Sequence, residues 1–292
     1  MRRRKSERQT ATANPFCKAI IMHILEELER IAREAGAIAQ GARAEGLAVT
    51  AKAQGEIVTS ADRAVHTGLM AAFARHFPGL PLLTEESPRH AIPAGPFLVA
   101  DEIDGTAPFS AGSAQWGVML AWMDPAPTHA VIHLPDLGVT ITAAQGEGCW
   151  LNGGRVALRA DDALGATLLG AEFNKRLRPE EWAWLQRLVS AARAVRATAC
   201  SAASTHELLS GVTGLYVNPR GGRIWDFAAP ALAISEAGGQ ICAPDGRPLA
   251  WDGVEMGLVA GANRGLLDTA LALRKGVPTV GPEAARDPAR GR

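Results

Sequence analysis

The sequence predicts an α/β protein built as two tightly joined lobes that meet near residue 155. Before that residue, apolar stretches follow one another across turn residues, which is typical of antiparallel sheet. After it, strand-like and helix-like stretches alternate, which favours an α/β arrangement. We therefore expect an N-terminal α+β lobe over residues 22–155 and a C-terminal α/β lobe over residues 156–275.

The composition excludes several classes of protein. A chain of 292 residues with 47% hydrophobic side chains can bury a substantial core. Its formal net charge is zero, so bulk electrostatics favours neither nucleic acid nor an acidic membrane as a partner. No apolar run reaches the roughly eighteen residues of a membrane-spanning helix. Cys17, Cys149, Cys200 and Cys242 form no CxxC pair, which predicts reduced thiols and a cytoplasmic location.

The two ends of the chain differ from the rest. Residues 1–21 begin with the basic run MRRRK, and the apolar stretch AIIMHIL is short and lacks a small-residue cleavage pattern. A disordered basic tail is therefore favoured over a signal sequence, and a start codon upstream of the true one at Met22 is a second explanation. Residues 276–292 are rich in Pro, Gly and Arg, which predicts a frayed tail.

Two helices are expected in the first lobe. From Met22 to about Ala44 the apolar positions step by four and three, which places them on one face of an amphipathic helix. The stretch 55–79 predicts a short strand, a capping pattern from Thr59 to Asp62 and a second helix that ends before Gly79. The apolar positions of the first helix are Ile24, Leu28, Ile31, Ala35, Ile38 and Ala42.

The strands of the first lobe are short and close together. LPLLTEES (80–87) and PFLVADEIDGT (96–106) each predict an apolar strand that ends in acidic residues. QWGVMLAWM (115–123), HAVIHLP (129–135) and GVTITAAQGEGCWLNGG (138–154) predict further strands with turns between them. Short connections of this kind favour antiparallel pairing.

The second lobe has longer connections. Strands are expected at TLLGAEF (167–173), GLYVNP (214–219) and MGLVAGA (256–262). No repeat with a period of about 20–50 residues is visible, so the lobe is not a solenoid. Helices are expected at 179–195, 201–211, 225–239 and 264–273.

Seven acidic residues occupy positions that indicate a site: Asp62, Glu85, Glu86, Asp101, Glu102, Asp104 and Asp226. Glu85 and Asp101 directly follow apolar strands, and ligands of α/β proteins gather beyond the carboxyl ends of strands. Carboxylates within a few ångströms repel one another, and Mg²⁺, which prefers oxygen ligands, relieves that repulsion. Ile103 can add its carbonyl, Gly105 lets an anion approach the backbone, and Thr106 supplies a hydroxyl.

Most of these residues, taken singly, have a simpler interpretation. Asp62 can be the acid of a helix's first turn, and Ser201 and Asp226 can be N-caps. The acids at 85–86 can lie in a solvated loop. The acids of DEID are harder to explain in this way, because the strand before them is too apolar for the edge of a sheet.

The combination of motifs resembles the inositol monophosphatase family. EIVTSAD, LLTEES, DEIDGTAPF and WDFAAPALAISEAGG occur in that family's order and at roughly its spacings. The resemblance runs from about Met22 to Leu273, and the D-x-I-D-G-T and W-D-x-A-A…E-A-G-G motifs are specific. It implies a layered αβαβα fold like that of fructose-1,6-bisphosphatase, a homodimer, and lithium-sensitive phosphomonoesterase activity. The implied cofactor is Mg²⁺, with two or three ions in each active site.

The resemblance also implies roles for individual residues. Thr106 and Asp62 look like the pair that orients and deprotonates the attacking water, and Glu85 is implied in catalysis as well. Lys52 resembles the lysine that precedes the family's V-T-x-A-D motif, although a surface lysine is the alternative. The implied metal ligands are the carboxylates of Glu85, Asp101, Asp104 and Asp226 and the carbonyl of Ile103. The implied substrate contacts are Asp104, Gly105, Thr106, Ser201, Ala202, Arg220 and Asp226.

The expected reaction is the hydrolysis of a small phosphate monoester by a metal-activated water. It needs no covalent nucleophile, and none of the seven histidines falls in these motifs. Phosphatases of the haloacid-dehalogenase type carry D-x-D-G-T, in which the nucleophile stands two positions before the general acid. Here Glu102 stands two before Asp104 and Asp101 three before it, which excludes that register.

Four positions depart from the family pattern. Glu102 replaces a proline and is expected to face away from its neighbours, Pro108 replaces an asparagine, and Cys200 replaces a glycine. Pro219 stands seven residues before Asp226, where inositol-selective members hold a sugar hydroxyl with an acid. That change argues against a strictly inositol substrate.

Cations near these positions suggest a substrate with a second negative charge. Lys175, Arg176, Arg220 and Arg223 either face the leaving group or are solvated surface residues. The alternatives to inositol monophosphate are therefore a fructose 1,6-bisphosphatase, a 3′-phosphoadenosine 5′-phosphate phosphatase or a histidinol-phosphate phosphatase. A non-enzymatic binder of phosphorylated ligands is the other class, although an intact water-activating pair argues against it.

Overall fold

The computed structural model describes residues 15–52, 56–159, 161 and 163–275. Residues 1–14 of the predicted N-terminal tail and all of the predicted C-terminal tail, residues 276–292, lie outside the described part of the chain. The helices of the described part are α1 (Pro15–Glu45), α2 (Ser60–His76), α3 (Thr106–Ser110), α4 (Pro179–Ala191), α5 (Ser201–Leu209), α6 (Ile224–Glu236) and α7 (Arg264–Lys275).

The first lobe is built on a seven-stranded sheet. Its strands follow one another across the sheet in chain order, and every neighbouring pair is antiparallel except β3 and β4, which are parallel. A separate antiparallel pair, β1 (Val49–Ala51) and β2 (Ile57–Thr59), precedes α2. The seven strands are β3 (Leu82–Thr84), β4 (Phe97–Asp104), β5 (Gly117–Met123), β6 (Pro127–Leu134), β7 (Val139–Ala144), β8 (Gly148–Leu151) and β9 (Gly154–Val156).

The second lobe is built on a five-stranded sheet of order β11-β10-β12-β14-β13. The first three strands in this order are parallel, and β14 is antiparallel to both of its neighbours. Two short 3₁₀ turns, η2 (Pro135–Leu137) and η3 (Leu164–Ala166), join elements of the chain. The five strands are β10 (Leu168–Ala171), β11 (Ala194–Arg196), β12 (Leu215–Arg223), β13 (Gln240–Cys242) and β14 (Glu255–Gly261).

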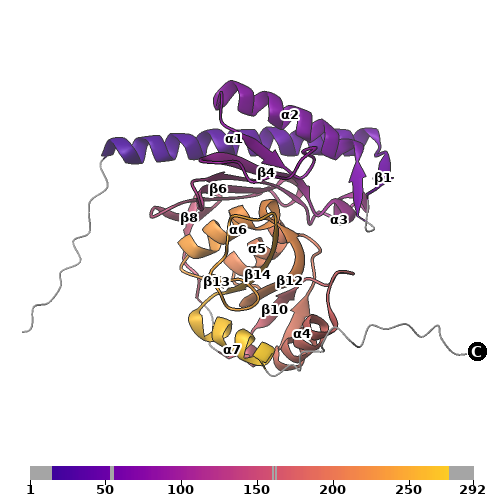
Figure 1. Cartoon of the computed structure of the whole chain (residues 1–292), viewed down its shortest axis with the longest axis vertical. Coiled ribbons are helices and arrows are strands. Elements are labelled where there is room, and N and C mark those ends of the chain that lie inside the picture. Colours follow the sequence, from indigo (N-terminus) through magenta and orange to yellow (C-terminus); the bar gives the residue numbers. More distant parts are fainter. Residues whose placement is uncertain (1–14, 53–55, 160, 162, 276–292) are drawn as a thin grey trace, which may run out of the picture.

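The elements stack in five layers (Figure 1). Helices α1 and α2 cover the outer face of the seven-stranded sheet, and α5 and α6 lie between the two sheets. Helices α4 and α7 cover the far face of the five-stranded sheet. This arrangement confirms the predicted αβαβα fold, with an antiparallel first sheet and an alternating second half. Each helical layer buries the apolar face of a sheet that would otherwise contact water.

Helix α1 is longer than the sequence pattern predicts. It begins at Pro15 rather than at Met22, so the predicted tail over 1–21 extends too far. Proline fits the first turn of a helix, and Ile21 packs against the apolar cluster below, which favours helix ahead of Met22. Like the other helices of the described residues, α1 lacks the continuous apolar stretch that crossing a membrane requires.

The buried face of α1 is also rotated from the predicted one. Ile38, expected to face the core, is 37% exposed, and its Cδ1 lies against Gly68 of α2, where a Cβ would come within 2.6 Å. Because α2 packs beside α1 on the same sheet, two neighbours rather than one decide which side chains are covered. The buried hydrophobic residues of α1 are Leu25, Leu28, Ile31, Ala32, Ala35 and Ala39.

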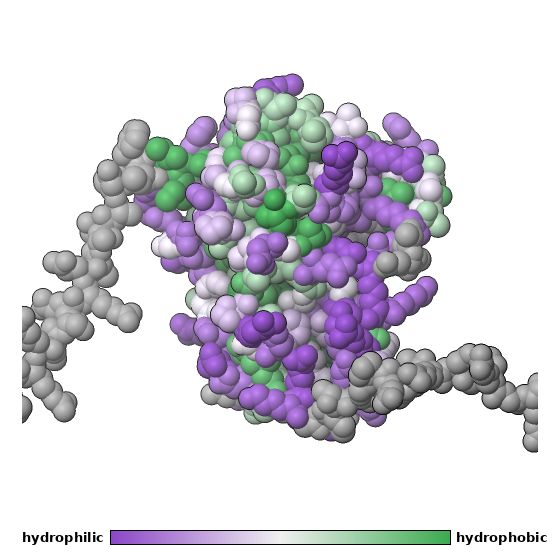
Figure 2. Space-filling model, viewed as in Figure 1, coloured by the Kyte–Doolittle hydropathy of each residue, from purple (hydrophilic) through white to green (hydrophobic). Residues whose placement is uncertain are grey.

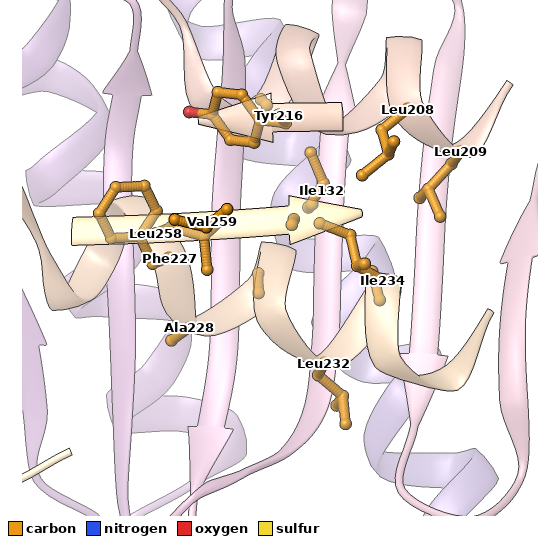
Figure 3. Close-up of a cluster of buried hydrophobic side chains, with 14 of the residues drawn as sticks. Ile132, Leu208, Leu209, Tyr216, Phe227, Ala228, Leu232, Ile234, Leu258 and Val259 are labelled. Carbon is orange, nitrogen blue, oxygen red and sulfur yellow. The ribbon is translucent and has the colours of Figure 1, made fainter. Parts of the chain in front are cut away.

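The main core lies between the two sheets. Figure 3 shows Ile132 of β6 among side chains of the central helices, with Leu208 from α5 and Phe227 from α6. Leu258 and Val259 of β14 close the cluster from the second sheet. A second cluster fills the space between the first sheet and helices α1 and α2. Strand β4 lies between these two clusters, and all eight of its residues are buried, including its acids.

Candidate active site

A cavity of about 700 Å³ lies where the two lobes meet. Its wall is formed by the segments after β3, β4 and β10, by the loop before β2, by the bulged end of β12, and by the first residues of α5 and α6. Predicted site residues that line it are Lys52, Glu85, Asp104, Gly105, Thr106, Ser201 and Asp226. The cavity therefore brings together motifs from separate parts of the chain.

A bulge at the end of β4 places Asp101 and Asp104 on the same side of the sheet. Asp101 pairs with Met119 of β5 and Asp104 pairs with Gly117, so β4 has one extra residue between these pairs. In a regular strand, residues three apart face opposite sides. The extra residue reverses that alternation. Candidate ligand oxygens of Asp101, Asp104 and Asp226 consequently lie within 4.8 Å of one another.

The two residues inside the bulge face the opposite way. Ile103 packs in the cluster beneath α1 and α2. The Glu102 carboxylate is 1% exposed, and its Oε1 lies 2.8 Å from His66 Nδ1 on α2. This contact raises the pKa of His66. The prediction that Glu102 faces away from its neighbours is confirmed, and its partner is a histidine outside the sequence motifs.

The three aspartates have the electrostatics of a cation site. Asp101 is buried and its Oδ1 has no hydrogen-bond partner among the described residues. Burial, and then Glu85 and Asp104 nearby, raise the pKa of Asp101 well above its ordinary value. Burial and Asp104 do the same to the pKa of Asp226. A hard divalent cation such as Mg²⁺ fits this all-oxygen set, because it would satisfy the orphaned oxygen and remove the mutual repulsion.

Helix starts hold Asp104 and Asp226 in place. Asp226 lies in the first turn of α6, and its Oδ2 accepts a bond of 2.5 Å from the backbone N–H of Arg223. Asp104 Oδ2 accepts from the backbone N–H of Ala202 at 2.6 Å and from the Cys200 thiol at 2.9 Å. Ala202, predicted to contact the substrate, thus donates its N–H to Asp104, and only the other oxygen of Asp104 is left for a ligand.

The turn after β4 requires glycine at position 105. Gly105 has a φ of 78°, which L side chains rarely adopt, and a Cβ there would lie 2.9 Å from the Cys200 Cβ. The turn brings Thr106 Oγ1 to 2.9 Å from the carbonyl oxygen of Ile103 and 3.3 Å from Asp62 Oδ1. The hydroxyl proton can be donated to one of these oxygens at a time.

Asp62 is positioned by the predicted capping pattern at the start of α2. Thr59 is the N-cap, and its backbone N–H and hydroxyl donate to Asp62 Oδ2 at 2.7 and 2.6 Å. Burial raises the pKa of Asp62, although the Thr59 bonds act to lower it. One carboxylate oxygen thus forms the helix cap while the other faces Thr106. The capping interpretation of Asp62 is therefore confirmed, and the same side chain also reaches the residue with which the sequence pairs it.

Lys52 belongs to the cavity rather than to the open surface. Its ammonium donates to Glu85 Oε1 at 2.9 Å and also contacts Glu86. Burial acts to lower the Lys52 pKa, but the two glutamates raise it above its ordinary value. Burial also raises the pKa of Glu85 to about 7, against the lowering effect of Lys52. Glu85 thus faces the cavity in contact with the Lys52 ammonium. It is near enough to add to the effect of burial in raising the pKa of Asp101, although it is not in the group of carboxylates whose oxygens lie within 4.8 Å of one another.

Of the remaining predicted substrate contacts, one lines the cavity and one does not. Ser201 lines the cavity, and its Oγ accepts from the Tyr216 hydroxyl at 3.2 Å. Arg220 does not line it, which contradicts the prediction. The Arg220 Nε donates to both oxygens of the buried Glu181 carboxylate, at 2.8 and 2.9 Å, and this pair turns the side chain toward α4. Of the cations considered with it, Lys175, Arg176 and Arg223 do line the cavity.

Glu172 is a site residue that the sequence reasoning missed. It is 8% exposed, lines the cavity, and accepts hydrogen bonds from Ser204 at 3.0 Å and Thr198 at 3.2 Å. Burial raises its pKa to about 7. The signal was present, since Glu172 directly follows the apolar strand β10, just as Glu85 directly follows β3.

Comparisons with known proteins agree with the fold and the motifs. The sequence profile of the Inositol monophosphatase family matches residues 22–278. The Nus factor SuhB of Pasteurella multocida is 29% identical over 220 residues, 73% of this chain and 82% of that protein. A fructose-1,6-bisphosphatase/inositol-1-monophosphatase of Thermotoga maritima is 26% identical over 196 residues, 64% of this chain and 71% of that protein. The crystal structure of the extragenic suppressor protein SuhB from Bartonella henselae superposes with a TM-score of 0.80 at 21% identity, covering 87% of this chain and 99% of that one. The chain therefore belongs to the inositol monophosphatase family.

Proposed function

We propose that the protein is a Mg²⁺-dependent phosphatase that hydrolyses a small phosphate monoester. The observation that carries the proposal is the cluster of Asp101, Asp104 and Asp226, with a buried, unpartnered oxygen, beside the Gly105–Thr106 turn. Family membership supports the same reaction class. Phosphate monoesters hydrolyse very slowly without a catalyst, so strong stabilisation of the transition state is needed.

The proposed metal ligands are the oxygens at the ends of β3 and β4 and at the start of α6. The three aspartates, together with Glu85 and the Ile103 carbonyl, would hold two or three Mg²⁺ ions. Magnesium held by these residues would lower the pKa of water and offset the negative charge that develops on the phosphate. Glu85 would exchange its contact with the Lys52 ammonium for this role, since both cations neutralise the same carboxylate.

Thr106 and Asp62 form the proposed proton path. The Thr106 oxygen accepts the proton of the attacking water while the Thr106 hydroxyl donates its own proton to Asp62 Oδ1, 3.3 Å away. Because burial raises the pKa of Asp62, its carboxylate takes up a proton more readily than an exposed aspartate does. The backbone N–H groups of Gly105 and Thr106 are the proposed donors to the phosphate. No covalent nucleophile takes part.

The leaving group is proposed to be a sugar or nucleoside. Pro219 provides no acid for a sugar hydroxyl, and Lys175, Arg176 and Arg223 add positive charge to the cavity wall. These cations support a bisphosphate as the alternative to inositol monophosphate, and one relative carries both fructose-1,6-bisphosphatase and inositol-1-monophosphatase in its name. No contact among the described residues favours histidinol phosphate in particular. A homodimer and a cytoplasmic location stay predictions.

A second candidate function is binding without turnover. The relative from Pasteurella multocida is named as a Nus factor rather than as a phosphatase. The Asp62–Thr106 pair argues against this candidate, because a binding protein has no need of a group that deprotonates water.

The test measures phosphate release from four esters, with and without Mg²⁺ and with Li⁺ added. The esters are inositol 1-phosphate, fructose 1,6-bisphosphate, 3′-phosphoadenosine 5′-phosphate and histidinol phosphate.

We expect Asp62→Asn to reduce kcat by on the order of 10²-fold or more while Mg²⁺ still binds, because the variant lacks the general base. Asp104→Asn should abolish both turnover and Mg²⁺ binding. Asp252→Asn, an exposed acid away from the cavity, is the matched control. Mg²⁺ binding without turnover of any ester would instead favour the binding function.

A further inference from the structure

A second cavity, of about 490 Å³, adjoins the first. The two share the wall residues Arg176, Gly221 and Arg223, which belong to the segment after β10 and the bulged end of β12. Hydrophilic side chains gather over this part of the molecule, where β12 and α4 lie (Figure 2). The volume of the second cavity is within the range of about 300–1,000 Å³ that is typical of small-molecule sites.

Arginine side chains dominate the wall of this second cavity. Three acids accompany them, Glu181, Asp245 and Glu255, so the formal charge of the lining is positive. Pro219, which carries no charge, also lines the cavity. The arginines are Arg176, Arg178, Arg220, Arg223 and Arg274.

Each of the three acids already has a cationic partner. Glu181 accepts from the Nε of Arg220. Asp245 pairs at 2.6 Å with Arg247, which does not line the cavity. Glu255 lies 3.2 Å from Arg223, but its side chain is 81% exposed, so water screens the attraction between the two charges. Arg176 is also paired, with Glu56 outside the second cavity's wall. Of the five arginines, Arg178 and Arg274 are therefore left without a hydrogen-bonded ion pair among the described residues.

Three of the guanidinium groups keep free donors. Only the Nε of Arg220 bonds to Glu181, and among the described residues its two Nη groups have no hydrogen-bond partner. The Arg178 guanidinium lies 4.0 Å from the Glu180 carboxylate, which is too far for a hydrogen bond. Arg274 lies over the Trp184 ring, 5.5 Å from its centroid, and forms no ion pair with a carboxylate in the described part of the chain, although, in addition to Arg247, its charge helps to lower the pKa of Asp245. The planar fork of arginine matches the oxygens of a phosphate group.

We propose that this arginine-lined cavity is a second anion site that binds a phosphate group. Two sources can supply that group. It is either free phosphate or pyrophosphate, or the second phosphate on the leaving group of a bisphosphate substrate. The second source rests on the proposed phosphatase function, because the leaving group would then extend from the first cavity across the shared wall. The first source does not depend on that function.

Calorimetric titration of pyrophosphate into the full chain with EDTA tests the site without turnover. Removing Mg²⁺ leaves the acids of the first cavity to repel an anion, so binding there is disfavoured. We expect Arg178→Gln and Arg274→Gln each to weaken pyrophosphate binding at least fivefold. Arg187→Gln, an exposed arginine of α4 outside both cavities, should leave it unchanged. Arg220 is not substituted, since its loss would leave the buried Glu181 unpaired.

Steady-state kinetics with Mg²⁺ distinguishes the two sources. If Arg178→Gln raises the KM for fructose 1,6-bisphosphate at least fivefold and leaves that for inositol 1-phosphate unchanged, the site holds the substrate's second phosphate. If pyrophosphate binding is weakened but neither KM changes, the site holds a free anion. The proposal is overturned if pyrophosphate does not bind in EDTA, or if Arg187→Gln weakens binding as much as the cavity variants do. Absence of turnover would contradict the proposed function and leave the calorimetric result to decide the anion site.

Discussion

Asp101 is a buried acid whose hydrogen bonds within the described residues are incomplete. Its Oδ1 is buried without a hydrogen-bond partner, and burial and neighbouring carboxylates raise the pKa of the group. An unpaired buried charge destabilises a fold unless a cation or a proton neutralises it. A cation bound at Asp101 would offset the loss of stability that this buried carboxylate causes.

The first prediction concerns Asp101→Asn. In EDTA the variant should be more stable than the natural chain by about 1–3 kcal/mol, because the amide removes a desolvated charge while keeping the shape of the side chain. In Mg²⁺ the order should reverse, since the variant lacks a ligand. Urea unfolding in EDTA and in Mg²⁺ measures both values. Equal stability of the two proteins in both solutions would contradict the metal role of Asp101.

Glu172 makes a pH-dependent contribution to stability. Burial raises its pKa to about 7, from 4.5 for an exposed glutamate. Between these values the folded chain holds a proton that the unfolded chain releases, so the free energy of unfolding falls as pH rises from 4.5 to about 7. Below pH 4.5 both states are protonated, and above about pH 7 the loss is complete.

The second prediction is that Glu172→Gln removes this fall. Relative to the natural chain, the variant should gain on the order of 1–3 kcal/mol between pH 4.5 and pH 8. Urea unfolding in EDTA across that range measures the gain. Glu26→Gln, an exposed position on α1, is the matched control. Parallel pH profiles for the natural chain and Glu172→Gln would show that the Glu172 proton plays no part.

Among the secondary-structure elements, the turn between β4 and α3 combines two backbone constraints beside the site. Gly105 combines a positive φ with a close approach to Cys200, whose thiol bonds to Asp104. Both features oppose any side chain at this position. Gly112, two residues after α3 ends, has a similar φ of 82°, but a Cβ added there would have no atom of the described residues within 4 Å.

The third prediction compares alanine at these two glycines. Gly112→Ala should lower the free energy of unfolding by about 1 kcal/mol, because alanine is strained at a positive φ. Gly105→Ala should lower it by about 2–4 kcal/mol, because the added Cβ also clashes with Cys200. Gly105→Ala should also weaken Mg²⁺ binding, since the clash displaces Cys200 and Ala202, which hold Asp104. Thermal unfolding and calorimetric Mg²⁺ titration measure the two effects. Equal losses in the two variants would exclude the clash.

At the scale of the whole molecule, the site joins the two lobes. Glu85, Asp101 and Asp104 come from the seven-stranded sheet and the residue that follows β3, whereas Asp226 lies at the start of α6 between the sheets. A cation held by all of them would connect both halves of the fold. The same junction explains why the cavity is lined by residues from both lobes.

The fourth prediction is that Mg²⁺ stabilises the whole chain. A ligand that binds only the folded state at 100–1,000 times its Kd adds about 2.7–4.1 kcal/mol to the free energy of unfolding. Differential scanning calorimetry should therefore show a higher Tm in Mg²⁺ than in EDTA. Asp226→Asn should remove most of this increase, and Asp252→Asn should keep it. A Tm that does not respond to Mg²⁺ in the natural chain would contradict the proposed metal site.

Local patterns in the sequence were enough to predict the two-lobed α/β fold, the cap of α2 and the acidic residues around the cavity. Such features depend on residues close together in the chain: apolar periodicity, turn residues and the acids at strand ends. The sequence prediction was wrong in starting α1 at Met22 rather than at Pro15 and in burying Ile38. The exposure of Ile38 depends on how α2 packs beside α1, which the pattern within α1 does not contain.

Only the tertiary structure decided how the site is assembled. The bulge in β4, which turns Asp101 and Asp104 to one side, depends on pairing with β5. Arg220 is directed away from the cavity by Glu181, a residue 39 positions earlier, and Lys52 is directed into it by Glu85, 33 positions later. A side chain takes its direction from the partner that folding brings to it, and charge pairs of this kind leave no periodic pattern in the sequence. The sequence alone therefore determined which residues could form a phosphate and metal site, whereas long-range packing determined which of them meet there.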